Sequence, residues 1–186
     1  MRNQNLSDAD LMDYSAVHLL YEFQYLWFSA KEVRQFRSPQ SMSSVLIESF
    51  GIHLRNLIDF FCTPTGSEQP DDVIASDYCL GWSEPLSSTL KTAKERVNKE
   101  LSHLTLKRKS DRDPSKPWNI DGLYTEVMAI ARRFVSQASP AKLSPDIGKW
   151  LSQGSLPTVL AVLPVIMATN TTSVMTSVVS IVKTGP

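Results

Sequence analysis

One stretch of the chain, RVNKELSHLTLKRK at residues 96–109, carries side chains that could act on a phosphodiester. Arg96 and His103 are seven positions apart. In an α-helix they would lie about two turns apart and within about 20° of each other around the axis. Histidine exchanges a proton near neutral pH, and arginine donates two parallel hydrogen bonds to phosphate oxygens. Such a pair could remove the proton of a ribose 2′-hydroxyl and stabilise the charge on phosphorus, which RNA cleavage without a metal requires.

The spacing of these two residues resembles the R-x4-6-H signature of HEPN domains, which are small helical bundles. The resemblance implies metal-independent cleavage of RNA, or binding of a nucleotide, with Arg96 holding phosphate and His103 acting as general acid or base. It also implies that Asn98 and Lys99 contact the substrate, and that two protomers form a homodimer in which their motifs meet. The signature commonly has Asn, Asp or His directly after the arginine, whereas this chain has Val97.

A second group of polar side chains lies in the sequence HLRNLID at residues 53–59. His53, Arg55 and Asp59 would support the first pair if their two helices lay side by side and enclosed a polar cleft. Arg55 and Asp59 are also spaced i and i+4, which predicts a surface ion pair worth about 0.3–0.5 kcal/mol. The sequence leaves two interpretations open: part of a site, or a buried histidine beside a surface ion pair.

Cations follow the histidine of the first stretch. Lys107 and Arg108 belong to the run KRK, and they could contact the phosphates of RNA or of a nucleotide. Cations near the C-terminus of a helix also interact favourably with its dipole, so this run has a purely structural explanation as well. The formal net charge of the chain is +0. Any attraction to nucleic acid would therefore come from a local patch.

We expect no metal or other cofactor. No H-x3-H or H-E-x-x-H spacing occurs, and a metal site assembled from His53, His103 and distant carboxylates such as Asp71 has no local signature. The two cysteines, Cys62 and Cys79, form no C-x-x-C pair, and we expect reduced thiols in a cytoplasmic protein.

Apolar residues recur every three or four positions along much of the chain. The pattern predicts helices at residues 11–36, 38–61, 86–104 and 120–134, with a short helix or turn in 71–82. Strand signals are absent from these stretches. The expected fold is all-α, an up-down bundle of four main helices with a short extra helix and an irregular apolar C-terminal tail.

Two regions are expected in the chain. Residues 1–140 form the helical bundle domain, and residues 141–186 form a linker broken by Pro and Gly and then an uncharged, apolar tail rich in Ser and Thr. A membrane helix needs about 20 mostly apolar residues, and Pro164 and Asn170 interrupt the run, so we expect no membrane span. The tail would instead pack along the bundle or bind a protein partner.

A wider likeness accompanies the motif. The segments ESFGIHLRNLIDFF, DDVIASDY and RVNKELSHLT, with Trp118, resemble a group of uncharacterised bacterial helical proteins, and the likeness implies a fold but no activity. The expected function is that of a HEPN-like protein that acts on RNA or binds a nucleotide. The competing hypothesis is a non-catalytic interaction module of a defence or mobile-element system. The sequence leaves open whether the protein is an enzyme.

Overall fold

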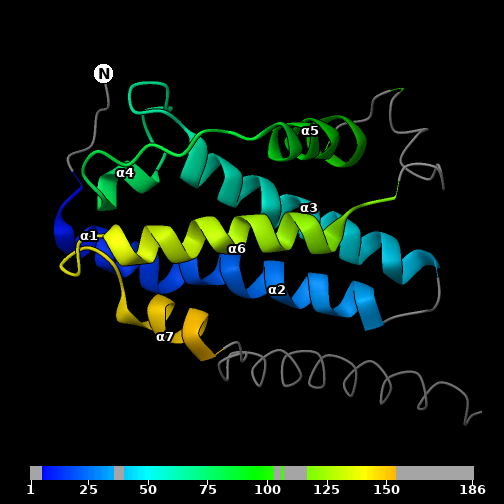
Figure 1. The fold of residues 1–186 in the computed structure, drawn as a ribbon, viewed down its shortest axis with the longest axis horizontal. Coiled ribbons are helices and arrows are strands. Elements are labelled where there is room, and N and C mark those ends of the chain that lie inside the picture. The colour runs from blue at the N-terminus through cyan, green and yellow to red at the C-terminus, as the bar shows by residue number, and fades with distance from the viewer. Residues whose placement is uncertain (1–5, 36–39, 103–105, 107–116, 154–186) are drawn as a thin grey trace, which may run out of the picture. The chain divides into compact units, whose positions relative to one another are not determined.

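A computed structural model describes residues 6–35, 40–102, 106 and 117–153. Every regular element in these ranges is helical and none is a β-strand, which confirms the predicted all-α class. The elements are α1 (Asp8–Tyr14), the π-helical segment η1 (Ser15–Leu19), α2 (Leu20–Gln35), α3 (Gln40–Cys62), α4 (Ala75–Tyr78), α5 (Ser88–Arg96), the π-helical segment η2 (Val97–Ser102), α6 (Ile120–Gln137) and α7 (Pro145–Gln153) (Figure 1).

The chain divides into two compact units, and the first is Met1–Lys149. The helix α7 therefore begins in the first unit, within the stretch that the sequence predicts to be a linker. The predicted apolar tail from residue 154 onward lies outside the described residues. None of the described helices is both long and apolar enough to cross a membrane.

The first predicted helix is present as one continuous helical stretch, α1–η1–α2. It begins at Asp8, where the Ser7 hydroxyl accepts a hydrogen bond from the Asp10 amide at 3.1 Å and the Asp10 carboxylate accepts one from the Ser7 amide at 3.0 Å. This reciprocal capping box stabilises the first turn. The π-helical segment begins at Ser15, which is fully buried and accepts a hydrogen bond from the Ser144 amide at 2.9 Å.

The second predicted helix, α3, contacts α2, α5, η2 and α6 (Figure 1). Gly51 lies in its middle and faces η2. A Cβ atom at this position would lie 2.5 Å from Leu101 Cδ1 and 3.2 Å from Val97 Cγ2. The glycine therefore allows η2 to approach α3 closely, which explains a residue that otherwise lowers helix stability by about 1 kcal/mol relative to alanine.

An aromatic cluster joins the C-terminal end of α3 to α4 and α6. Phe134 of α6 meets Phe60, Phe61, Tyr78 and Trp82 edge to face, with ring centroids 5.3 to 5.8 Å apart. The Trp82 indole also donates a hydrogen bond to the Phe61 carbonyl at 2.9 Å. Edge-to-face pairs stabilise beyond their buried area, so the cluster fixes α6 against α3.

The third predicted helix begins later than the pattern indicates. Leu86, the first residue of the predicted range, precedes the helix and is 38% exposed. The helix starts at Ser88 because the Ser87 hydroxyl caps it, accepting a hydrogen bond from the Leu90 amide at 3.1 Å. From Val97 the chain continues as η2. The fourth predicted helix, α6, extends past its expected end at Phe134 to Gln137.

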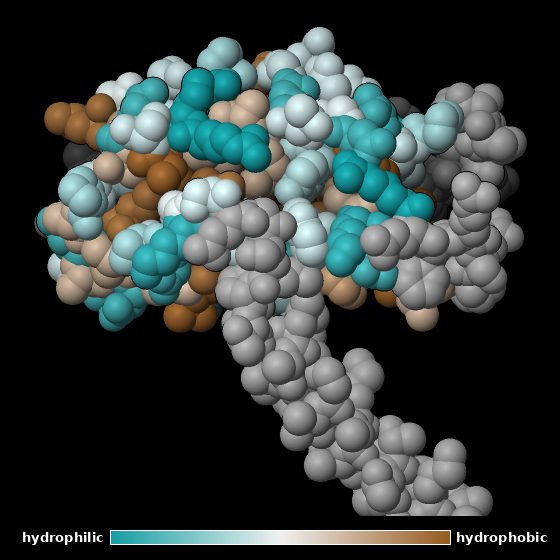
Figure 2. All heavy atoms as spheres, turned by 60° about the horizontal axis from the view of Figure 1, so that its bottom comes forward, coloured by the Kyte–Doolittle hydropathy of each residue, from teal (hydrophilic) through white to brown (hydrophobic). Residues whose placement is uncertain are grey.

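Figure 2 shows that hydrophilic and hydrophobic residues interleave over one face of the described helices. Their buried side chains come from every long helix, including Phe23 of α2, Leu54 of α3, Leu90 of α5 and Val127 of α6. This shared core fixes the helices that carry Arg96, His53 and Arg55 relative to one another.

Candidate functional site

Arg96, the last residue of α5, is held between two neighbours. Its Nε atom donates a hydrogen bond to Glu100 Oε2 at 3.0 Å, and its guanidinium carbon lies 4.0 Å from the centroid of the Trp118 ring. The side chain of Arg96 is 21% exposed and that of Glu100 is 9% exposed. Because Trp118 lies two residues before the first residue of α6, the stacked pair ties the end of α5 to the beginning of α6.

Arg96 lines a groove of about 330 Å³ between α5 and the start of α6. Among the described residues that line it, Arg96 alone is charged. The others supply an aromatic ring, three hydroxyls, one amide and several apolar groups: Ser88, Thr89, Thr92, Ala93, Pro117, Trp118, Asn119 and Leu123. A nucleotide needs such groups, because aromatic rings stack on bases and guanidinium and hydroxyl groups bind phosphate and ribose.

The neighbours of Arg96 along the chain lie elsewhere. Asn98 is half-buried and Lys99 is exposed on η2, and neither lines the groove. Val97, which stands where the HEPN signature commonly has a polar residue, is fully buried against Gly51. A polar side chain there would lose its hydration in the core, so this position favours an apolar residue.

Three residues of the predicted site, His103, Lys107 and Arg108, lie outside the described residues. Their proposed roles remain predictions from the sequence.

His53 is part of a polar contact between α3 and α2. Its Nδ1 atom lies 2.8 Å from Glu22 Oε2, and the Asn56 amide donates to Glu22 Oε1 at 3.2 Å. The rings of Tyr21 and Tyr25 flank the imidazole at 5.4 Å between centroids. Only 8% of His53 is exposed. These described contacts join α2 to α3 at the helix interface, and the catalytic role expected of His53 stays a prediction from the sequence.

Arg55 and Asp59 form the predicted i, i+4 ion pair, with Arg55 Nε 3.6 Å from Asp59 Oδ2. The distance is too long for a hydrogen bond, and Arg55 Nε is shielded from solvent. Asp59 Oδ1 also pairs with Lys94, so this carboxylate links α3 to α5. The structure thus brings Asp59 of the second polar group against Lys94 of α5. Arg96, however, lines a different pocket from Arg55 and Asp59.

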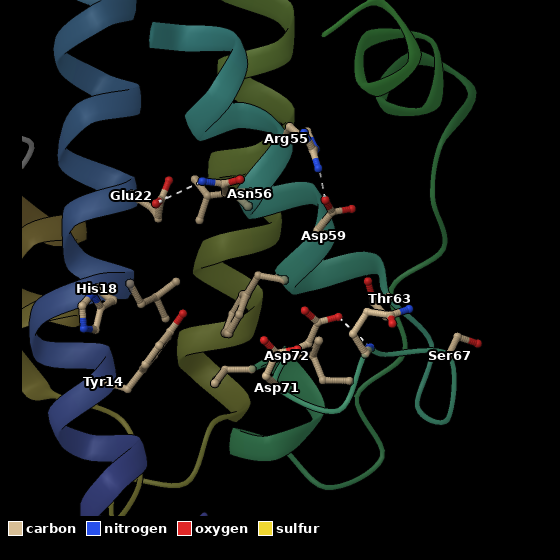
Figure 3. A pocket seen from close by; sticks show the side chains of 16 residues that line it. Tyr14, His18, Glu22, Arg55, Asn56, Asp59, Thr63, Ser67, Asp71 and Asp72 are labelled. Carbon is tan, nitrogen blue, oxygen red and sulfur yellow. Dashed lines mark hydrogen bonds and ion pairs between the residues drawn. The ribbon is translucent and has the colours of Figure 1, made fainter. Parts of the chain in front are cut away.

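The pocket that Arg55 and Asp59 line has a volume of about 570 Å³ (Figure 3). Its walls come from α1–η1–α2, from α3 and from the loop that leads to α4. The lining residues are Tyr14, His18, Leu19, Glu22, Arg55, Asn56, Leu57, Asp59, Phe60, Thr63, Ser67, Gln69, Asp71, Asp72, Val73 and Ile74. Sequence reasoning missed Tyr14, His18 and Glu22 as neighbours of Asp71 and Asp72, because no local spacing connects segments so far apart in the chain.

Carboxylates dominate the charge of this pocket. Glu22, Asp59, Asp71 and Asp72 face it, against the single guanidinium of Arg55 among the described lining residues. Burial, and then the negative charges of Glu22 and Asp72, raise the pKa of the Tyr14 hydroxyl. Across residues 6–35, 40–102, 106 and 117–153, no three His, Cys, Asp or Glu side chains lie close enough to hold a metal ion.

The Cys62 thiol is not an activated nucleophile. Cys62 and Cys79 are both free thiols. Burial, and then the charge of Glu84, raises the pKa of Cys62 to about 11. A thiol with this pKa is almost entirely protonated at neutral pH, and the thiolate is the nucleophilic form.

No family model, curated protein or solved structure matches the chain.

Proposed function

We propose that the protein binds RNA or a nucleotide in the α5–α6 groove, with Arg96 as the phosphate contact, and that it cleaves RNA without a metal as a HEPN-like endoribonuclease. The observation that carries the proposal is the position of Arg96. It is the charged residue among the described residues that line the groove, and it stacks on Trp118. The remaining elements come from the sequence: an up-down arrangement of four main helices, a homodimer that brings two motifs together, and a cytoplasmic location.

Glu100 and Trp118 fix the guanidinium before any ligand arrives. A side chain that is already ordered loses less conformational entropy when it binds phosphate, so this arrangement favours affinity. The indole offers a surface for a base, and the hydroxyls of Thr89 and Thr92 are suited to ribose or phosphate oxygens.

In the proposed reaction, His103 accepts the proton of a ribose 2′-hydroxyl as its oxygen attacks the adjacent phosphorus. Arg96 stabilises the negative charge that develops on the phosphoryl oxygens. The bond from phosphorus to the 5′-oxygen breaks, and the leaving oxygen takes up a proton, which leaves a 2′,3′-cyclic phosphate and a 5′-hydroxyl. Lys107, Arg108, Asn98 and Lys99 would contact the flanking phosphates.

A second candidate function is a non-catalytic interaction module whose apolar tail binds a protein partner. The observation that favours it is the same set of contacts at Arg96. An ion pair with the buried Glu100 and stacking on Trp118 are also what a residue makes when its role is to hold two helices together.

The test measures binding of a fluorescently labelled single-stranded RNA by anisotropy and cleavage of the same RNA in EDTA, with the full chain. Arg96→Gln should weaken binding about tenfold, since a hydrogen bond to a charged group contributes about 1.5–3 kcal/mol. His103→Ala should bind RNA but fail to cleave it. Arg132→Gln removes a cation from an exposed position of α6 and serves as the matched control, with affinity within about twofold of wild type.

Each outcome decides between the candidates. Wild-type affinity in the Arg96→Gln protein would remove the groove as the binding site. Binding without cleavage by the wild type would leave a nucleotide-binding protein that is not an enzyme. Absence of both binding and cleavage by the wild type on varied RNAs would support the interaction module.

A further inference from the structure

Most of the large apolar side chains that the described residues leave exposed belong to the α1–η1–α2 stretch and to α3, which packs on α2. Of nine such side chains, these helices carry six: Tyr14, Val17, Tyr21, Met42, Val45 and Ile52. Single exposed apolar residues are common on proteins, whereas a contiguous patch of them marks an interaction surface. Whether the six form a patch depends on the helix faces to which they belong.

On α3 the exposed apolar residues lie on a stripe of their own. Val45 and Ile52 are 59% and 48% exposed, and they are seven residues apart, so they point in nearly the same direction. The stripe repeats at spacings of three and four: Met42, Val45, Ser49, Ile52 and Asn56. This spacing is that of a helix that packs against another helix, and none of the five residues is charged.

On α1–η1–α2 the apolar residues follow the edge that borders α3. They recur at spacings of four, four and three: Val17, Tyr21, Tyr25 and Phe28. The rings of Tyr21 and Tyr25 flank His53 of α3, and Glu22 accepts a hydrogen bond from Asn56 at 3.2 Å (Figure 3). The two stripes therefore border one seam between α2 and α3. We call their combined surface the α2–α3 face.

The α2–α3 face is large enough for a stable protein interface. α3 has 23 residues, which gives a length of about 35 Å, and two helices side by side are about 20 Å wide. The face thus offers about 700 Å² on each copy and about 1,400 Å² for two copies, and stable interfaces bury about 1,200–2,000 Å². Its composition also fits, because Tyr, Phe and Met are enriched at interfaces and charged residues are depleted at their centre.

The α2–α3 face is complementary to itself. In a dimer with a two-fold axis, the same patch of each copy forms the interface, and residues at equal distances from the axis meet. We place the axis at the level of Ile52, across the helices, so that each helix runs antiparallel to its copy. Tyr21 of one copy then meets Tyr25 of the other, and Val17 meets Phe28. Apolar and aromatic groups thus meet their own kind along α2.

Two charges at the edge of the α3 stripe are complementary in the same arrangement. Glu48 and Arg55 are seven residues apart, and Ile52 lies between them. An antiparallel copy brings Glu48 of each chain beside Arg55 of the other. Arg55 Nε is shielded from solvent and has no hydrogen-bond partner among the described residues, since Asp59 Oδ2 is 3.6 Å away. A carboxylate of a second copy would supply the partner that such a group normally has.

We propose that a second copy of this chain docks on the α2–α3 face, with the two α3 helices antiparallel about a two-fold axis near Ile52. The described residues that line the Arg96 groove lie outside this face. The contact therefore differs from the HEPN-like dimer in which two motifs meet, and it does not rest on the proposed RNA binding.

The experiment is sedimentation equilibrium of the full chain without RNA, between about 1 and 100 µM, where a dimer of moderate affinity dissociates. Circular dichroism identical to that of the wild type is required of every variant. Ile52→Arg places two like charges at the axis and should weaken dimerisation at least about a hundredfold. Leu80→Arg is the matched control: this leucine is 103% exposed on the turn after α4, outside the face, and its replacement should change the dimerisation constant by less than about twofold.

A charge exchange tests the arrangement of the helices. Arg55→Glu should weaken dimerisation about tenfold or more, because Glu48 of the second copy would then face a like charge. Adding Glu48→Arg reverses both members of the pair and should return the dimerisation constant to within about threefold of wild type. A variant that had merely lost its structure would show no such recovery.

A wild-type protein that stays monomeric at about 100 µM would overturn the proposal and assign the face to a different protein. Dimers that persist in Ile52→Arg, or that weaken equally in Leu80→Arg, would also overturn it, because association would then come from other apolar parts of the chain, such as the predicted tail. Failure of the double variant to recover would overturn the antiparallel arrangement. None of these results depends on Arg96 or on cleavage of RNA.

Discussion

The role of Arg96 in folding can be separated from its proposed role in binding. We expect Arg96→Met to destabilise the protein by about 2–4 kcal/mol. The Glu100 side chain is only 9% exposed and would lose a hydrogen bond from a charged donor, which costs about 1.5–3 kcal/mol. Stacking on Trp118 adds about 0.5–1 kcal/mol, since Arg96 keeps part of its surface in water. Methionine retains the length and the apolar stem of the side chain.

The assay is urea unfolding followed by circular dichroism, arranged as a double-mutant cycle with Glu100→Gln. If the ion pair carries the larger share, replacing Arg96 in the Glu100→Gln background should cost about 1–2 kcal/mol less than in the wild type. Arg132→Met is the matched control. Its arginine is exposed on α6, and surface substitutions of this kind usually stay within about 0.5 kcal/mol.

The reasoning would be refuted by a free energy of unfolding for Arg96→Met within about 0.5 kcal/mol of wild type. If Arg96→Met lowers the free energy of unfolding equally with and without Glu100→Gln, the ion pair contributes nothing, and only the stacking on Trp118 remains as a source of stability. The outcome also bears on function. An arginine that contributes little to stability but is required for RNA binding serves the ligand, whereas the opposite result identifies a packing residue and favours the interaction module.

Two further predictions concern α3. Gly51→Ala should destabilise the protein by about 1 kcal/mol or more in urea unfolding, because the clash with Leu101 and Val97 outweighs a gain in helix propensity of about 1 kcal/mol. Gly148→Ala is the control: its new Cβ atom would meet its nearest neighbour at 3.7 Å, so this variant should be more stable than wild type. A Gly51→Ala protein that is more stable than wild type would contradict the close approach of η2 to α3. Since burial raises the pKa of Cys62 to about 11 from an ordinary 9.0, the unfolded chain loses this proton first as pH rises, so the thiol's contribution to stability is complete below about pH 9 and declines through about pH 11. Cys62→Ala should flatten the fall in unfolding free energy over that window, and an unchanged slope would refute the assignment.

The sequence predicted the helices well where one apolar face repeats without interruption. The stripe of α6 is an example: Leu123, Val127, Ile130 and Phe134 recur every three or four positions, and all four are buried. The third helix was predicted too long at its start, because Leu86 continues the apolar spacing although the Ser87 hydroxyl begins the helix after it. The first residue of a helix is set by the side chain that caps it through a hydrogen bond to the backbone, and the spacing of apolar residues does not reveal that residue.

The candidate site was less accessible from the sequence. The sequence predicts a role for Arg96 only through its spacing to His103. The place of Arg96 in a groove depends on Trp118, which lies far along the chain. The ion pair of Arg55 and Asp59 was predictable because it lies within one helix. The link from Asp59 to Lys94 and the contact of His53 with Glu22 were not, because each joins two helices.

The sequence by itself determined the all-helical class and the buried faces of the helices, since both follow from residue types at a fixed local spacing. Only the tertiary structure decided which helices meet, and hence that Arg96 and Arg55 line different pockets and that Glu22, Asp71 and Asp72 share one. The physical reason is that helix–helix packing brings together side chains from distant segments. The spacing of apolar residues within one helix shows which face is buried but not which helix covers that face.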